Sequence, residues 1–135
     1  MPFLEWKDSY NIGVKEIDIQ HRGLFDLVSK LSNTKHKYRD HKFFAVTLDT
    51  LMRYAELHFA TEERYMLEAG YPKFEEHKKE HTGFIDAVAG LIRDLERHQP
   101  GIEQKILEFI HGWYSDHILG TDRDYLESFK AKGFK

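Results

Sequence analysis

The sequence has 135 residues, 41% of them hydrophobic and 32% charged, which suits one folded domain and leaves no room for a second core. Twenty basic against 23 acidic residues give a formal charge of -3, so no basic surface is expected to bind nucleic acid. Because the chain contains no cysteine, disulfides, thiolate metal sites and iron-sulfur clusters are excluded, and any metal must be held by His, Asp or Glu.

The N-terminal residues lack the basic and apolar regions of a secretory signal, and no run of about 18 apolar residues follows anywhere in the chain. We therefore expect no transmembrane segment and a cytoplasmic location. Residues 1–17 fit no helical pattern, but Trp6 and Ile12 give them enough apolar surface to lie along the protein as an ordered arm.

After the arm, the chain carries apolar residues at the spacing i, i+3, i+4, i+7, which is typical of helices with one buried face. Asp18 and Asp40 are candidate N-caps for the first two helices, Gly70 ends the second, and Pro72 suits the first turn of the third. The predicted elements are bundle helices over 18–37, 40–69, 72–97 and 102–119, and a short last helix over 122–131.

Four amphipathic helices joined by short connections are expected to pack antiparallel, because a short loop can only return the chain beside itself. The sequence thus predicts an all-α fold: a single domain over 1–135, formed by an up-down-up-down antiparallel four-helix bundle with an N-terminal arm and a short C-terminal helix.

Five of the nine histidines and one glutamate fall on the predicted buried faces. A single buried histidine is more often a core residue that a neighbour satisfies, but the antiparallel topology brings all six of these side chains to the same end of the bundle. They are His21 on the first helix, His58 and Glu62 on the second, His77 and His81 on the third, and His117 on the fourth.

Asp122 is the candidate seventh member of this group. It follows His117 by five residues, which on an ideal helix places it on a different face. Asp122 reaches the same point only if the backbone widens into a π-bulge or unwinds, and Gly120 makes such a departure inexpensive. We therefore predict a distorted helix end over 118–122.

Burying these polar side chains without a partner would be costly, and imidazoles and carboxylates are good ligands for first-row metals. Seven side chains are too many for one octahedral ion, so two metals are implied. If both carboxylates bridge and a single-atom oxo or hydroxo bridge joins the metals, about 11 of roughly 12 coordination positions are filled. One position is left for a small ligand.

This pattern of residues resembles hemerythrin, and specifically the single-domain bacterial members of that family. The resemblance covers nearly the whole chain and rests on Trp6, Gly13, Ile17-Asp18-x-Gln20-His21, His58-x-x-x-Glu62, His77-x-x-x-His81 and His117-x-x-x-x-Asp122.

The resemblance implies a centre of two non-haem iron ions, Fe2+ or Fe3+ with an oxo or hydroxo bridge, that binds O2 reversibly. It also implies a role for each ligand. The six-coordinate iron would be held by His77, His81 and His117, the iron with the open position by His21 and His58, and the two bridges would be Glu62 and Asp122.

The expected function is O2 storage, buffering or delivery to an O2-consuming enzyme, by a monomer that is not itself an enzyme. Five neutral imidazoles and two carboxylates place less negative charge on the metals than carboxylate-rich di-iron sites do, which disfavours high-valent oxidation chemistry. The alternatives are a module that senses or scavenges O2 or NO, a di-iron oxidase or peroxidase, and a bundle that binds zinc adventitiously.

Tyr114 departs from the family pattern, which often has an aliphatic residue three positions before the histidine of the fourth helix. Two interpretations stay open. In one, Tyr114 packs with its hydroxyl at the surface. In the other, it lines the ligand pocket, where its hydroxyl would alter O2 retention or autoxidation.

Overall fold

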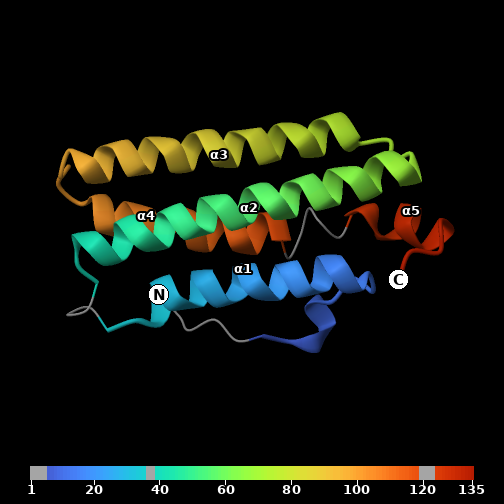
Figure 1. Ribbon diagram of the computed structural model, residues 1–135, viewed down its shortest axis with the longest axis horizontal. Helices are drawn as coiled ribbons and strands as arrows, with labels where there is room; N and C mark the ends of the chain where they lie inside the picture. The colour runs from blue at the N-terminus through green and yellow to red at the C-terminus, as the bar shows by residue number, and fades with distance from the viewer. Residues whose placement is uncertain (1–5, 36–38, 119–123) are drawn as a thin grey trace.

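The structure, a computed structural model, describes residues 6–35, 39–118 and 124–135, and these ranges contain helices and no strand. Four main helices lie side by side along the long axis of the molecule (Figure 1). They are α1 (Lys15–Asn33), α2 (His41–Ala69), α3 (Phe74–Glu96) and α4 (Ile102–Trp113). A π-helical segment, η3 (Tyr114–Ile118), continues α4, and two short helices, η1 (Asp8–Tyr10) and α5 (Leu126–Ala131), lie near the two ends of the chain.

Successive main helices run in opposite directions, and each packs against two neighbours, so that α4 returns to contact α1 (Figure 1). The predicted all-α, up-down-up-down four-helix bundle is confirmed. Short connections between α2 and α3 and between α3 and α4 leave the chain no other way to pair its apolar faces.

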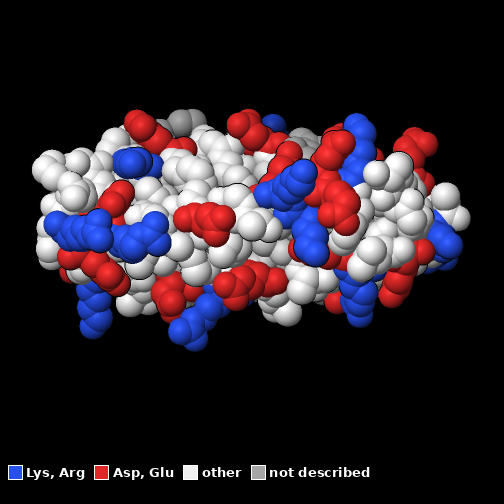
Figure 2. Space-filling view, turned by 90° about the horizontal axis from the view of Figure 1, so that it is seen from above, with Lys and Arg blue, Asp and Glu red and all other residues white. Residues whose placement is uncertain are grey.

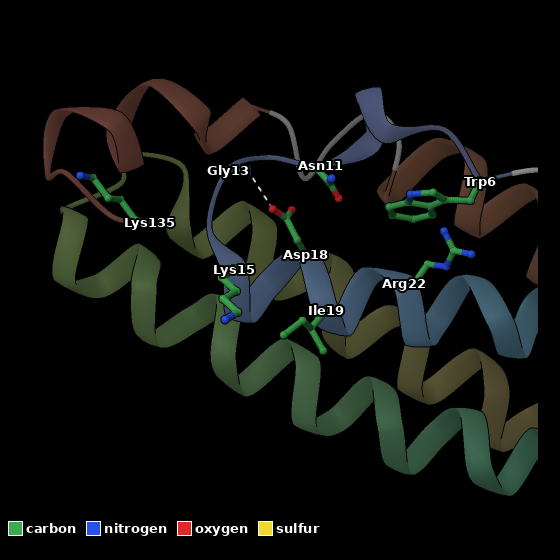
Figure 3. A pocket seen from close by; sticks show the side chains of 8 residues that line it. All are labelled: Trp6, Asn11, Gly13, Lys15, Asp18, Ile19, Arg22 and Lys135. Carbon is green, nitrogen blue, oxygen red and sulfur yellow. Dashed lines mark hydrogen bonds between the residues drawn. The ribbon is translucent and has the colours of Figure 1, made fainter.

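The first helix begins earlier than the sequence predicted, at Lys15 rather than residue 18. Asp18 is therefore not the N-cap. It lies inside the first turns of α1, and its carboxylate reaches back to accept hydrogen bonds from the backbone N–H of Ile12 at 2.7 Å and of Gly13 at 3.1 Å (Figure 3). The side chain does satisfy backbone donors before a helix, as a cap would, but from within the helix.

The first helix also ends earlier than predicted, at Asn33 rather than residue 37, and the short last helix begins at Leu126 rather than residue 122. The boundaries of the second helix follow the sequence more closely. Asp40 caps α2 as predicted, accepting from the N–H of Phe43 at 2.8 Å. Gly70 directly follows the last residue of α2, and its φ of 65° is the left-handed conformation that commonly ends a helix. The start of α3 differs from the prediction, since Pro72 lies in the preceding turn and the helix begins at Phe74.

The described part of the N-terminal arm, residues 6–14, runs along α1 in the opposite direction (Figure 1). Trp6 anchors it: the indole lies 5.6 Å from the Phe25 ring, and the Arg22 guanidinium sits 4.9 Å above the indole face. An open surface groove lies beside the arm and α1, and Trp6, Asp18 and Arg22 are among the residues that line it (Figure 3).

Two apolar clusters fill the interior of the described structure. The larger, main core occupies the bundle and includes Leu24, Leu48, Val88 and Ile106. The smaller, which we call the end cluster, joins the arm, α1, the end of α2 and α5, and consists of Ile12, Val14, Ile17, Met66, Tyr71, Tyr125 and Phe129. The end cluster closes the end of the bundle where α1 begins and α2 ends.

The outer surface carries both signs of charge. On the face shown in Figure 2, basic and acidic side chains are interspersed rather than separated into large areas of one sign. Among the residues described, no helix combines the length and the apolar character that crossing a membrane requires.

Two helix glycines should respond oppositely to alanine. A Cβ at Gly83 would meet nothing within 4 Å, so Gly83→Ala is expected to raise the free energy of unfolding by about 0.5–1 kcal/mol. A Cβ at Gly23 would collide with the Tyr54 ring, which crosses directly over it, so Gly23→Ala should show no such gain. Urea unfolding of both variants checks this, and an equal gain for the two would contradict the close approach of Tyr54.

Candidate metal centre

The structure brings six of the seven predicted site residues together, and it does so in two groups. One group contains Glu62, His77, His81 and His117, and the other contains His21, His58 and Glu62. Within each group, one donor atom from every residue lies within 4.8 Å of the others, and every member is buried. Glu62 belongs to both.

Glu62 occupies the middle of the cluster with no exposed surface. Its Oε1 lies 2.7 Å from His58 Nε2 and 3.6 Å from His81 Nε2, while its Oε2 lies 3.7 Å from His77 Nε2. Oε1 therefore lies near one histidine of each group and Oε2 near a second histidine of the larger group, so the carboxylate lies between the two groups.

The convergence follows from the position of each of these side chains on its helix. His21 is in the first half of α1, His58 and Glu62 are in the second half of α2, and His77 lies in the first turn of α3. His117 follows α4 in η3. In the antiparallel bundle these positions share one end, which the end cluster covers. The rings pack closely: centroids are 4.6 Å apart for His21 and His58 and 5.0 Å for His77 and His117.

A widened turn is present in the fourth helix, while all but the first residue of the predicted distortion over 118–122 lies outside the described residues. The π-helical turn covers residues 114–118 and so includes His117 itself, whereas the sequence placed the distortion at 118–122, after this histidine. Asp122 and residues 119–121 lie outside the described residues, so the position of the seventh candidate ligand stays a prediction. Wide i to i+5 turns within α-helices are frequent at functional sites.

Polar side chains around the histidines form a second layer that the sequence analysis missed. His58 Nδ1 lies 2.9 Å from Gln20 Oε1, His81 Nδ1 lies 3.0 Å from Glu63 Oε2, and His117 Nδ1 lies 2.9 Å from Glu80 Oε2. In each case the outer partner contacts Nδ1 of the histidine, and Nε2 points toward the centre of the cluster. Such outer contacts are typical of histidines that bind metals.

These donor groups fit a pair of metal ions. Imidazole nitrogens and carboxylate oxygens suit iron, and the site contains no thiolate that would favour softer metals. His81 Nε2, which is buried, has no hydrogen-bond partner among the described residues and points toward Glu62. Buried polar atoms of this kind are costly without a partner, and a cation at the centre of the cluster would supply one.

Comparison with known proteins identifies the family. A family model described as the hemerythrin HHE cation binding domain matches residues 12–128. The chain belongs to the hemerythrin family. A bacteriohemerythrin of Clostridium acetobutylicum is 35% identical over 127 residues, covering 90% of this chain and 98% of the relative. A bacteriohemerythrin of Stenotrophomonas maltophilia is 34% identical over 133 residues, covering 97% and 84%.

Solved hemerythrin structures share the whole fold. A crystal structure of wild-type hemerythrin superposes with a TM-score of 0.81 at 28% identity, covering 95% of this chain and 98% of the other. A hemerythrin variant in which tyrosine replaces leucine gives a TM-score of 0.82 at 29% identity, covering 96% and 98%. The hemerythrin bundle therefore accounts for nearly all of this chain.

Tyr114 is buried, with 1% of its surface exposed, so the interpretation that places its hydroxyl at the surface is wrong. Its ring lies 6.2 Å from that of Phe25, and its hydroxyl has no hydrogen-bond partner among the described residues. Burial raises the pKa of the Tyr114 phenol well above its ordinary value of about 10.

Tyr114→Phe should remove the cost of this buried hydroxyl and raise the free energy of unfolding by about 1 kcal/mol at pH 7. Above about pH 10 the tyrosine ionises in the unfolded chain but stays protonated in the folded one, so the wild type loses stability there. Relative to the phenylalanine variant, that loss is at most about 1.4 kcal/mol per pH unit. Urea unfolding at pH 7, 9 and 11 measures both effects; parallel pH dependence of the two proteins would refute the second.

Proposed function

We propose that this protein binds O2 reversibly at a non-haem di-iron centre and serves O2 storage, buffering or delivery to an O2-consuming enzyme. The observation that carries the proposal is the division of the cluster into a group with three histidines and a group with two, both containing Glu62. Membership of the hemerythrin family supports iron as the metal.

The proposed ligands are those that the sequence pattern selects. We assign one iron to His77, His81 and His117 and the other to His21 and His58, with Glu62 and Asp122 as bridges. The group with two histidines supplies fewer protein donors, so it is the side with room for an external ligand. When bound, an iron pair supplies two electrons to O2 and recovers them as O2 leaves.

The surrounding residues would keep this exchange reversible in two ways. Leu24, fully buried in the main core, and Ile17, fully buried in the end cluster, flank the ligand-bearing turn of α1 and help to exclude water. The hydrogen bonds that the histidine rings make to the oxygens of Gln20, Glu63 and Glu80 hold the rings in fixed orientations, so the proposed ligands need not rearrange.

The test is iron analysis combined with repeated anaerobic-to-aerobic optical titration. A carrier should contain about two irons per chain and should change colour on each addition of O2, reversing on its removal without net consumption of O2. Steady O2 consumption with a reducing substrate would instead identify an oxidase or peroxidase. A colourless protein that contains zinc would overturn the proposal, and capture of an O2-dependent stoichiometric partner would replace storage with sensing.

A further inference from the structure

Three histidines of the proposed centre have hydrogen-bonding neighbours of two different kinds. The partners of His81 and His117, both in the group with three histidines, are the carboxylates of Glu63 and Glu80. The partner of His58, in the group with two, is the neutral amide of Gln20. The Gln20 contact is also the most deeply buried, since Gln20 is 9% exposed, whereas the side chains of Glu63 and Glu80 are 23% and 48% exposed.

The contacts of Thr61 determine which way the Gln20 amide points. The Thr61 hydroxyl donates its one proton to the carbonyl oxygen of Leu57, at 3.1 Å, so toward Gln20 it can only accept. Gln20 Nε2 accordingly donates to Thr61 Oγ1, at 3.0 Å, and the amide oxygen is left facing His58. If the amide were reversed, its NH2 would face His58 and its oxygen would lack the proton that Thr61 gives to Leu57.

The orientation of the amide in turn fixes the proton on His58. Gln20 Oε1 can only accept, so His58 Nδ1, at 2.9 Å, must be the donor. In the neutral ring the lone pair is then on Nε2, the nitrogen that lies 2.7 Å from Glu62 Oε1 at the centre of the cluster. The backbone of α2 thus determines, through Thr61 and Gln20, which nitrogen of His58 carries the lone pair that can bind a metal.

We propose that Gln20 and Thr61 are positioning residues that hold His58 in the form with its proton on Nδ1, and that they make the two metal positions electronically unequal. A carboxylate acceptor increases the basicity of a ligating imidazole more than a neutral amide does. The metal at His81 and His117 therefore receives more negative charge than the metal at His58. The metal at His58 consequently retains the lower oxidation state more readily. This inference rests on the metal assignment of the proposed function.

The first test uses two variants of Thr61, one that keeps the hydroxyl and loses the methyl group, and one that replaces the hydroxyl by a methyl group. Thr61→Ser keeps the donor and acceptor, whereas Thr61→Val keeps the shape and removes both. Under anaerobic conditions, titration with Fe2+ should give two tightly bound ions in the wild type and in Thr61→Ser. In Thr61→Val one of the two should bind about 10- to 100-fold more weakly, because the amide is free to turn and present its NH2 to His58.

The second test reads the proton on His58 directly. In protein loaded with Zn2+, which is diamagnetic, 15N NMR of the imidazole nitrogens should show His58 protonated at Nδ1 in the wild type and in Thr61→Ser. Loss of this signature in Thr61→Val supports the proposed hydrogen-bond relay, that is, the chain of contacts from Thr61 through Gln20 to His58. If Thr61→Val binds both metals with unchanged affinity and keeps the Nδ1 proton, the relay is refuted, while the O2 proposal still stands.

The third test addresses the electronic inequality. Gln20→Glu keeps an acceptor next to His58 but makes it anionic, so it should lower the midpoint potential of one of the two one-electron steps of the iron pair. Glu80→Gln should raise the potential of the other step. If the two midpoint potentials stay unchanged in these variants, or shift by the same amount, the proposed electronic difference between the two metal positions is refuted. If the wild type fails to bind two irons at all, the proposed function fails first, and independently of these variants.

Discussion

Glu62→Gln is expected to reduce the iron content from about two per chain to well below one. Glu62 is the one residue shared by the two described groups of donors, and it is completely buried. The amide removes the negative charge that both metal positions would share and one of the two oxygens, so one position loses its oxygen ligand and the other keeps only a neutral one. The iron content per chain and the O2-dependent change in absorbance should decrease together.

The matched control is Glu68→Gln, which makes the same chemical change on the exposed face of α2. It should retain about two irons and the full optical response. If Glu62→Gln keeps both irons, Glu62 does not bridge them, and the proposal of two metal positions that share Glu62 is refuted. Loss of only one iron would assign Glu62 to a single metal.

Removal of the metals should cost the folded protein several kcal/mol. Each ion that binds only the native state stabilises it by about 4 kcal/mol when its free concentration is 1,000-fold above the dissociation constant. The holoprotein should therefore unfold at a clearly higher temperature than the protein treated anaerobically with a chelator. The buried imidazoles and Glu62, which the ions would satisfy, account for the difference.

The comparison of melting temperatures needs a control protein whose stability does not depend on bound iron. Glu62→Gln serves this purpose, because its melting temperature should be the same with and without added Fe2+. Equal melting temperatures for holo and chelated wild type would mean that the cluster is satisfied without metal. That result would favour the adventitious-binding alternative over a resident metal pair.

Much of the fold was predictable because buried faces repeat with the helical period and short loops restrict topology. Helix starts were less predictable. A carboxylate such as that of Asp18 satisfies the same backbone donors whether it precedes the helix or lies in its first turns, so the residue type alone does not locate the boundary. Pro72 presents the same difficulty, since its fixed φ suits a turn as well as a helix.

The inner side chains of the candidate site were predictable for the same reason as the helices. His58 with Glu62 and His77 with His81 are each one turn apart on a buried face, and topology brings the faces together. The outer partners were not predictable in this way. Glu80 pairs with His117 across two helices, 37 positions apart, and its exposed location on α3 looks like any solvated acid.

The end cluster has a consequence for the order in which the protein matures. Its members include Ile17 near the beginning of α1 and Phe129 in α5, and Tyr125, whose ring lies 5.7 Å from that of His77, connects it to the candidate metal ligands. During synthesis, Ile17 emerges from the ribosome long before Tyr125 and Phe129 can reach it. The cover over the candidate site is thus completed by residues translated more than a hundred positions later, so it cannot close before the chain has been made as far as Phe129.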